Sequence, residues 1–288
     1  MIGVYRYSAL GDIAAALPVI RALTEPVVVT SGLGAQLLAD ESVEVVELGS
    51  KGVGELLKNA LILRRRGIKR LIDLQNNDRS RLLRLFFEAF TNKGVSFDQS
   101  VTHIFYDIAK KSGEIGELDT DFTPKPKEYI VLNMGSSPKW LSKRLPEHKW
   151  REFSEVLHER FGLPFVLTGD RSEREYVEHV AKKLVGRVEI AAGKTSIQEL
   201  KSLLSGAFLC VSTDSAPMHI AAAQKTPTIG LFGATNWIVS APFGPWSVAL
   251  HDKNNPLPTK NRLEIGDYYE GIDIEEGLDR LRDYVVVR

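Results

Sequence analysis

The feature that most constrains this chain is a regular alternation of short β-rich runs with longer segments of helical period. In the first half the predicted strands are IGVYRY, PVVVT, VEVVEL and KRLIDLQ, and a helix through Arg79–Phe90 closes this half. In the second half they are YIVLNMG, PFVLTG, AFLCVS and TPTIGLFG. Strands separated by helix-length segments are typical of a parallel sheet wound on both faces. The pattern predicts an α/β protein.

The length of 288 residues exceeds what a single core usually serves, so we expect two doubly wound domains. Between the halves, the stretch GELDTDFTPKPKEY combines acidic residues and prolines with a loss of apolar period, which is typical of a linker. The predicted domains are residues 1–122 and 129–288, and the sequence leaves open whether the last helix packs back on the first domain. Two such domains form a cleft, and their ligands bind beyond the carboxyl ends of the strands.

Several other classes of protein and site are not expected. The apolar runs fall short of the roughly 20 residues that span a bilayer, and the N-terminus lacks the pattern of a signal peptide, so we predict a cytoplasmic protein. The single cysteine, Cys210, lies in an apolar run and is expected to be a buried strand residue. Asp119 and Asp121 form an Asp-x-Asp pair, but they fall in the linker rather than at a strand end, so no metal site is expected.

The charge is balanced overall but uneven along the chain. From Lys51 to Lys93 there are eleven Lys or Arg residues against four Asp or Glu. Such an excess fits a face that meets an anionic surface, and solvated helix faces are the alternative. Phe86 and Phe87 in this stretch are interpreted as helix core rather than as stacking platforms, which argues against nucleic acid as a partner.

Polar motifs follow the predicted strands. After the first strand, Gly11 and Asp12 lead into a helix that contains Pro18. Asp12 stands where a helix N-cap would, and it could instead serve as a general base. In the second half, Asp214, Ser215 and Ala216 open a helix whose N-terminus could hold a phosphate, with helix capping as the alternative.

Two further loops carry charged candidates. The loop from Ser136 to Pro146 contains three cations, Lys143 among them, which suit a pyrophosphate but could equally be a solvated loop. The stretch from Asp170 to Glu173 could present a carboxylate to ribose hydroxyls, or could cap the following helix. His219, by itself, reads as a packed helix residue.

Together these segments resemble glycosyltransferase family nine, the ADP-heptose:lipopolysaccharide heptosyltransferases, over roughly residues 1 to 245. The matching segments are Arg6, Ser8, Leu10-Gly11-Asp12 and Pro18; Asp73-Leu74-Gln75 and Arg79-Ser80; Lys143 and Pro146; Asp214-Ser215-Ala216-Pro217-Met218-His219-Ile220-Ala221-Ala222; and Leu231-Phe232-Gly233. The chain departs from the family pattern at Leu145, where tryptophan is usual, and at Ala216, where glycine is usual.

The resemblance implies a GT-B fold of two Rossmann-like domains facing across a cleft, and an inverting transfer of heptose from ADP-heptose to the inner core of lipopolysaccharide. Asp12 would be the catalytic base. The donor-binding residues would be Lys143, Glu173, Asp214, Ser215, Ala216 and His219, and no metal or other cofactor would be obligatory. The acceptor-binding residues would be Ser8, Gln75, Arg79, Arg64, Arg65 and Arg66.

The N-terminal domain would then bind the acceptor at the cytoplasmic face of the inner membrane, and its basic stretch would contact the anionic membrane surface. Two alternatives remain open at this point. One is another nucleotide-sugar enzyme of the same fold, such as an epimerase, a hydrolase or a transferase with a different hexosyl donor. The other is a non-catalytic binder of anionic glycans.

Overall fold

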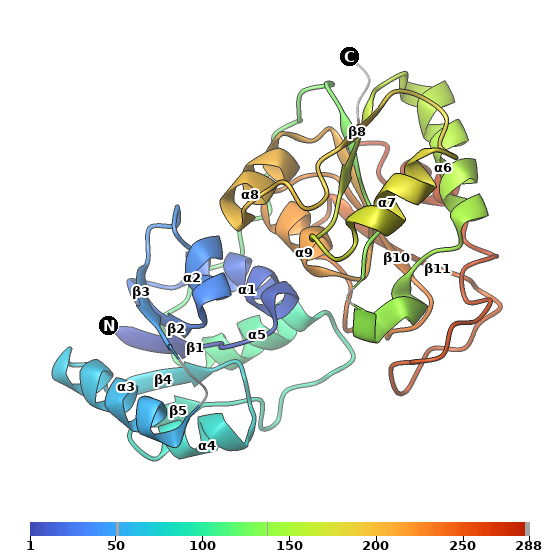
Figure 1. The fold of residues 1–288 in the computed structure, drawn as a ribbon. Helices are drawn as coiled ribbons and strands as arrows, with labels where there is room; N and C mark the ends of the chain where they lie inside the picture. Colours follow the sequence, from blue (N-terminus) through green and yellow to red (C-terminus); the bar gives the residue numbers. More distant parts are fainter. Residues whose placement is uncertain (50–51, 137, 286–288) are drawn as a thin grey trace. The chain divides into compact units, whose positions relative to one another are not determined.

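The computed structural model describes residues 1–49, 52–136 and 138–285, and divides the chain into two compact units, Met1–Asp119 and Thr120–Arg288. Lys51 of the basic stretch and Ser137 of the cationic loop lie outside the described residues. Each unit is built on its own parallel sheet and has its own core. Figure 1 shows the elements of both.

The described residues of the first unit form a five-stranded sheet in the order β3-β2-β1-β4-β5, with every pair parallel. Its strands are β1 (Ile2–Tyr5), β2 (Pro26–Thr30), β3 (Glu44–Glu47), β4 (Arg70–Asp73) and β5 (Glu88–Phe90). Its helices are α1 (Leu10–Ala22), α2 (Gly32–Leu37), α3 (Val53–Arg65), α4 (Asp78–Arg84) and α5 (Val101–Lys110). The central strands β1 and β2 are buried along their whole length, as continuous apolar runs in parallel sheets are.

The helices of the first unit cover both faces of its sheet. The chain runs outward from β1 to β3 and then crosses back to β4, so right-handed connections place α1 and α2 on one face and α3 and α4 on the other. The contacts agree, because α3 packs on α4 and α1 packs on α2 and α5 (Figure 1). The helix α5 was not predicted, and it is held by its apolar face and by a bond from Thr102 Oγ1 to the Ala15 carbonyl (2.8 Å).

In the second unit the described residues form a six-stranded parallel sheet in the order β11-β10-β9-β6-β7-β8. The strands are β6 (Ile130–Asn133), β7 (Phe165–Thr168), β8 (Val188–Ile190), β9 (Leu209–Thr213), β10 (Thr228–Phe232) and β11 (Ser247–His251). The helices are the 3-10 helix η1 (Pro138–Lys143), α6 (Glu147–Phe161), α7 (Arg174–Ala181), α8 (Ile197–Gly206), α9 (Ala216–Ala223) and α10 (Ile274–Arg280). The last helix, α10, packs on β11 and α6 of the same unit.

Cys210 lies on β9 with no exposed surface, which confirms that it is a buried strand residue. Burial raises the pKa of its thiol to about 12, so the thiol stays protonated at neutral pH. Such a group is a poor nucleophile.

The structure corrects three sequence predictions about strands and helices. The helix predicted through Arg79–Phe90 ends at Arg84, and β5 follows, because its backbone pairs with the free edge of β4. Phe87 therefore packs in the core from a turn, while Phe86 is exposed. The short strands β8 and β11 at the two edges of the second sheet were missed, since edge strands carry weaker apolar patterns.

Both sheets have the strand order of dinucleotide-binding folds, with reversal points between β1 and β4 and between β6 and β9. Chain segments leave the two strands at such a point in opposite directions, which opens a crevice beyond their carboxyl ends. The loops after β1, β4, β6 and β9 carry most of the sequence motifs. Within the described residues, none of the helices is both long and apolar enough to cross a membrane.

Candidate functional site

Asp12 lies in the loop-to-helix junction after β1, but not at the position expected from the sequence. Ala9 occupies the N-cap of α1, and Asp12 is the third residue of the helix. Its Oδ2 accepts a long hydrogen bond from the Ala9 amide (3.4 Å) and forms an ion pair with Arg6. The Asp12 side chain is 41% exposed, so a carboxylate oxygen is within reach of a ligand in solution.

Arg6 holds Asp12 in place through their ion pair. Its Nη1 donates to the Leu74 carbonyl (2.6 Å), and its guanidinium stands over the Phe105 ring at 5.3 Å. Burial lowers the pKa of Arg6 and the negative charge of Asp12 raises it, and an arginine remains protonated under such opposing effects. Arg6 is therefore a fixed positive partner that orients Asp12. Arg6 was assigned no role in the site from the sequence, because the predicted strand IGVYRY contained it. Its match to the family pattern was the available signal.

Gln75 joins the ends of the two strands at the reversal point of the first sheet. Its Oε1 accepts from the amides of Tyr7 (2.9 Å) and Ser8 (3.1 Å). The fully buried Asp73 supports this turn, because its Oδ1 accepts from the Gln75 amide (3.0 Å) and its Oδ2 lies 2.8 Å from Arg84 Nε. The structure thus brings together Ser8, Gln75 and the loop that leads to Asp12.

The arginines proposed to bind acceptor do not lie together. Arg79 is exposed in the first turn of α4, at the carboxyl edge of the sheet with Gln75. Arg64, Arg65 and Arg66 end α3 and lie at the opposite, amino edge, because the helix runs antiparallel to the strands it connects. The ion pair of Arg66 with Glu44, the first residue of β3, confirms this placement.

Much of the positive charge in the basic stretch is neutralised locally. Arg66 pairs with Glu44, Arg70 with Glu114 and Glu88, Arg81 with Asp78, and Arg84 with Asp73. Among the residues that the structure describes, Arg64, Arg65, Lys69 and Arg79 form no ion pair. The charge excess in the sequence therefore overstates the charge available to a partner.

A hydrogen-bond network ties three neighbouring strands at the reversal point of the second sheet. Asn133, the last residue of β6, accepts at Oδ1 from Thr168 Oγ1 (3.1 Å). Its Nδ2 donates to Ser212 Oγ (3.0 Å) and to Ser215 Oγ (2.7 Å). Because this buried network fixes Ser215 to β6 and β7, the start of α9 is rigidly placed. Asn133 was not predicted as a site residue, because it lies inside an apolar run.

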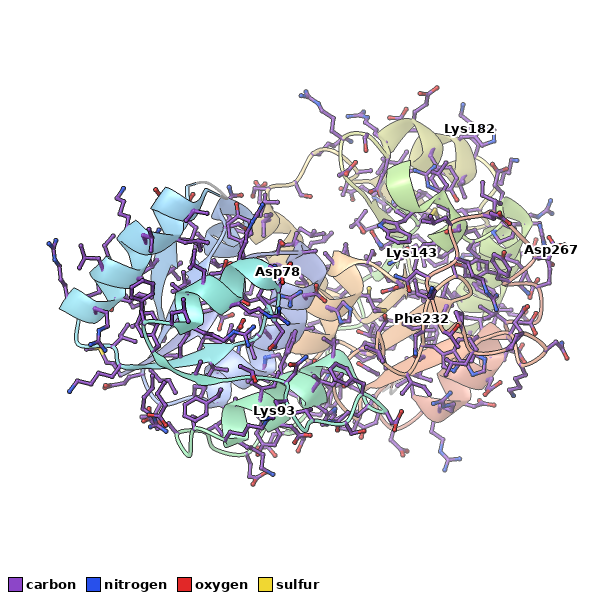
Figure 2. All side chains as sticks on the ribbon, turned by 90° about the horizontal axis from the view of Figure 1, so that it is seen from below. Asp78, Lys93, Lys143, Lys182, Phe232 and Asp267 are labelled. Atoms are coloured by element: carbon purple, nitrogen blue, oxygen red, sulfur yellow. The ribbon has the colours of Figure 1, made fainter. Side chains whose placement is uncertain are left out.

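Lys143 and Asp214 form the charged pair of this edge. Lys143 Nζ lies 2.9 Å from Asp214 Oδ2 and 3.3 Å from the Asp214 carbonyl, and the side chains are 17% and 9% exposed. Figure 2 labels Lys143 and Phe232, the last residue of β10. The structure therefore joins two residues that the sequence placed in separate loops.

The start of α9 offers backbone donors. Ser215 is at its N-cap, with its hydroxyl engaged by Asn133 and the Thr213 carbonyl, and no side chain among the described residues caps the first amides of the helix. Asp214 does not cap α9 either, because its carboxylate pairs with Lys143. Ala216 opens the helix, and His219 is buried one turn further on.

Glu173 lies against the carboxyl ends of β6 and β7. Its Oε2 accepts from the Asp170 amide (2.7 Å), and its carboxyl group occupies the space that a side chain at Gly135 would fill. Burial raises the pKa of Glu173, the Asp170 amide opposes this shift, and the Arg144 charge also lowers the pKa. Glu173 is the N-cap residue of α7, but its side chain makes no capping bond. Asp170 Oδ1 accepts from the amides of Ser172 and Glu173, which stabilises the turn before the helix.

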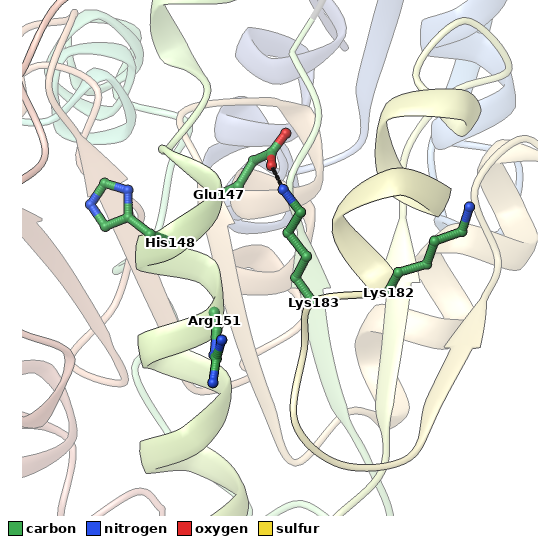
Figure 3. Close-up of a pocket in the computed structure, with 5 residues that line it drawn as sticks. All are labelled: Glu147, His148, Arg151, Lys182 and Lys183. Atoms are coloured by element: carbon green, nitrogen blue, oxygen red, sulfur yellow. Dashed lines mark hydrogen bonds and ion pairs between the residues drawn. The ribbon is translucent and has the colours of Figure 1, made fainter.

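An open pocket of about 680 Å³ lies elsewhere on the second unit. It is lined by Glu147, His148, Arg151, Lys182 and Lys183 (Figure 3). Lys183 points at Glu147 and forms an ion pair with it, which lowers the pKa of Glu147. The pocket contains none of the predicted site residues, and its acidic group is already neutralised, so it is a weak candidate for the site.

The described residues contain no cluster of three or more His, Cys, Asp or Glu side chains arranged to hold a metal ion. The Asp119 and Asp121 pair is not part of any such cluster. The charged pairs at the strand ends that involve predicted site residues are Asp12 with Arg6 in the first unit and Lys143 with Asp214 in the second.

The fold is shared with solved structures of low sequence identity. A family 9 glycosyltransferase from Veillonella parvula has a TM-score of 0.70 at 19% identity, covering 86% of this chain and 85% of that one. The Escherichia coli heptosyltransferase WaaC with ADP has a TM-score of 0.69 at 18% identity, covering 86% and 92%. These likenesses show two parallel-sheet α/β domains of the GT-B type.

Curated relatives match part of the chain. Lipopolysaccharide heptosyltransferase 3 of Escherichia coli K12 is 42% identical over 145 residues, which are 49% of this chain and 41% of that protein. Lipopolysaccharide heptosyltransferase 1 of Pseudomonas aeruginosa is 33% identical over 122 residues, which are 42% and 33%. The matched segments thus span less than half of the length of these two relatives.

The family comparison covers more of the chain. The sequence profile of glycosyltransferase family 9 (heptosyltransferase) matches residues 72–269. The match contains Gln75 in the first unit and both Lys143 and Asp214 in the second. It also extends past Pro245, beyond the region where the resemblance was expected. Because more than half of the chain matches, the chain belongs to glycosyltransferase family 9.

Proposed function

We propose that this protein is an inverting glycosyltransferase that moves heptose from ADP-heptose to the inner core of lipopolysaccharide. The observation that carries the proposal is that each unit of this family 9 chain has its own charged strand edge, and that the two edges differ in chemistry. One presents a half-exposed carboxylate oriented by an arginine, and the other presents a lysine beside uncapped helix amides. These are the groups that a base and a diphosphate leaving group require.

In the proposed reaction an acceptor hydroxyl attacks the anomeric carbon in line, forming the new glycosidic bond as the bond to the diphosphate oxygen breaks. Asp12 takes the hydroxyl proton, and Arg6 keeps its carboxylate in position. The attack from the side opposite the leaving group inverts the anomeric configuration. Proton transfer to a positioned base contributes about 10²- to 10⁴-fold to such reactions.

The leaving diphosphate gains negative charge, and the second unit supplies fixed donors for it. Lys143 would share its ammonium between Asp214 and a phosphate oxygen, while the amides at Ser215 and Ala216 face the same charge with the helix dipole behind them. Glu173 would accept hydrogen bonds from the ribose hydroxyls, and His219 would lie near the phosphates. A lysine and a helix N-terminus can stabilise this charge, so we expect turnover to survive chelation of divalent metals.

The names of the relatives support this donor and acceptor. The similar curated proteins are named lipopolysaccharide heptosyltransferases, and solved neighbours from Escherichia coli contain ADP and ADP-2-deoxy-2-fluoro heptose. On this chain, Ser8, Gln75 and Arg79 share the edge that carries Asp12, and we propose that they contact the acceptor. Arg64 and Arg65 lie at the other edge and would contact a different anion.

We propose that these two arginines contact the anionic headgroups of the membrane surface. The outward side of α3 carries Val53, Leu57 and Leu61, which are 58%, 44% and 51% exposed and recur every fourth residue. The same helix ends in the exposed and unpaired Arg64 and Arg65. An apolar stripe beside arginines suits the interface of an anionic bilayer. The protein would thus attach peripherally to the cytoplasmic face of the inner membrane, where its glycolipid acceptor lies.

The reaction is tested by incubating the protein with a panel of nucleotide sugars, with and without truncated lipopolysaccharide, and reading the products by mass spectrometry. The proposal predicts a mass increase of one heptose on the glycolipid, with ADP-heptose only. Free sugar or an epimerised donor formed without acceptor would favour the hydrolase or epimerase alternative. Binding of the glycolipid without turnover of any donor would leave a non-catalytic glycan binder.

A further inference from the structure

The segment between β11 and α10, residues 252–273, contains no helix or strand. Hydrogen bonds nevertheless hold it to the rest of the second unit. At its two ends, Asp252 accepts from the amides of Asn254 (2.8 Å) and Gly271 (3.1 Å), which closes the segment into a loop. These bonds lower the pKa of Asp252, so the closing carboxylate stays ionised at neutral pH. A loop of this length in a compact domain is usually functional.

Arg262 ties the middle of the loop to the carboxyl edge of the sheet. Its amide donates to the Ala234 carbonyl (2.8 Å), and its Nη1 donates to the Gly233 carbonyl (3.2 Å), both just after β10. Its guanidinium stacks on the Tyr268 ring at 4.4 Å, and its own carbonyl accepts from Ser142 Oγ (2.7 Å). Arg262 therefore joins β10 to the 3-10 helix η1.

Tyr269 makes the second bond to η1. Its hydroxyl donates to the Ser142 carbonyl (2.9 Å), and its side chain is almost fully buried. Burial raises the pKa of Tyr269 above its ordinary value, so the hydroxyl remains a donor at neutral pH. A side chain at Gly233 would lie 2.7 Å from Tyr268 and Tyr269, so the loop can approach β10 only over a glycine.

Ser142 is therefore held on both sides, by the Arg262 carbonyl at its hydroxyl and by the Tyr269 hydroxyl at its carbonyl. The next residue is Lys143, whose Nζ reaches Asp214. We infer that Arg262 and Tyr269 are positioning residues that fix the backbone of η1 and so hold Lys143 in the geometry for binding a diphosphate. The inference rests on the proposed role of Lys143 in binding ADP.

The physical reason is the conformational entropy of the backbone that carries Lys143. A mobile backbone loses conformational freedom when its lysine binds a ligand, and this loss weakens the binding. A backbone clamped at the preceding residue removes part of that cost before the ligand arrives. Loss of the bonds from Arg262 and Tyr269 to Ser142 should thus weaken ADP binding only through Lys143.

The experiment is a double-mutant cycle on ADP affinity measured by calorimetry. Tyr269→Phe removes one hydroxyl and is expected to weaken ADP binding about threefold to tenfold, the scale of one hydrogen bond. In a Lys143→Ala background the same change is expected to have almost no effect. Ser142→Ala, which removes the bond to Arg262 and leaves Tyr269 intact, should act in the same way with a smaller effect.

Tyr129→Phe is the matched control, because the Tyr129 hydroxyl also donates to a carbonyl, that of Leu203 (2.8 Å), before the amino end of β6. Unfolding of every variant is followed in urea, so that a general loss of stability is recognised. The inference would be wrong if Tyr269→Phe weakened ADP binding equally with and without Lys143. It would also be wrong if the effect were no larger than that of Tyr129→Phe. If Lys143→Ala alone leaves ADP affinity unchanged, the proposed donor site fails instead.

Discussion

The carboxyl edges of the two sheets share a strand order and differ in what they expose. In the first unit the reversal point ends in Asp12, which is 41% exposed and supported by a buried arginine. In the second unit the charged pair of Lys143 and Asp214 is mostly covered, and a buried network with the anchored loop around Arg262 surrounds it. One edge has a carboxylate that is open to solvent, and the other has a lysine that is mostly covered.

The difference fits the needs of the two ligands proposed above. A base must reach a hydroxyl that arrives with a large and variable acceptor, so its carboxylate has to be open to solvent. A diphosphate is bound more strongly by donors that are already fixed and partly desolvated, because they need little reorganisation and act at a lower dielectric. The same fold therefore supplies the position of each site, and the side chains around it supply the chemistry.

The largest expected effect is on turnover and comes from a change at the carboxyl edge of the first sheet. Asp12→Asn keeps the size of the side chain but removes its basicity, so turnover should fall by about two to four orders of magnitude while ADP affinity and folding persist. Glu55→Gln is the control, since Glu55 is likewise an acidic residue in the first turn of a helix. Steady-state kinetics with truncated lipopolysaccharide measure both. Near-normal turnover of Asp12→Asn would reduce Asp12 to a partner of Arg6.

The next largest effect is on ADP affinity and comes from a change at the carboxyl edge of the second sheet. Lys143→Ala should weaken ADP binding by about 1.5 to 3 kcal/mol, the scale of a hydrogen bond to a charged group. The control is Lys183→Ala, because Lys183 also pairs with a carboxylate, that of Glu147, but outside the candidate site. Calorimetry on both variants and the wild type makes the comparison. Equal affinity in all three proteins would move the donor site away from this edge.

A smaller effect concerns the amino edge of the first sheet. Replacing Arg64 and Arg65 by Ser should cost about 1 kcal/mol each in binding to vesicles that contain anionic lipopolysaccharide precursor. Raised salt should erase this difference, because the Debye length is only about 8 Å at physiological salt. Adding Arg66→Ser should change less, since Arg66 is already paired with Glu44. ADP affinity should not change.

Co-sedimentation at low and high salt measures this effect, and two matched variants sharpen it. Leu57→Ser with Leu61→Ser should weaken vesicle binding at both salt concentrations, because apolar contacts are not screened. Leu33→Ser, an exposed apolar residue on α2, should change nothing. Wild-type protein that never sediments would leave Arg64 and Arg65 as a solvated helix end, and self-association through α3 would show as a dimer in ultracentrifugation.

The smallest effect is a pH dependence in the second unit. Glu173 has a raised pKa in the folded protein because of its burial, so the unfolded chain releases this proton first. Its contribution to stability is then present below its ordinary pKa of 4.5 and is lost as the pH rises through the folded value. The free energy of unfolding of wild type should fall relative to Glu173→Gln over that rise.

Urea unfolding at a series of pH values measures this difference. Glu175→Gln, at an exposed position of the same helix, is the control and should track the wild type. A constant difference between wild type and Glu173→Gln across the series would mean that Glu173 titrates alike in the folded and unfolded chains.

The sequence by itself determined the class of fold and the places where function was to be sought. Central strands such as β2 and β9 are buried along their whole length and begin as apolar runs, so local pattern alone identifies them. Asp12, Lys143 and Asp214 were found because each follows a predicted strand, and Gln75 was found through the family resemblance. The short edge strands β5, β8 and β11 were not found, since backbone pairing with a neighbour creates them.

Only the tertiary structure decided which of these residues lie together. Lys143 and Asp214 are 71 residues apart and meet because β6 and β9 are neighbours in the sheet. The arginines of α3 and Arg79 are close in sequence and lie at opposite edges, because a helix reverses the direction of the chain. Arg262 and Tyr269 reach Ser142 through a loop with no periodic pattern. Contacts of this kind depend on how distant segments pack, which no local pattern of residues records.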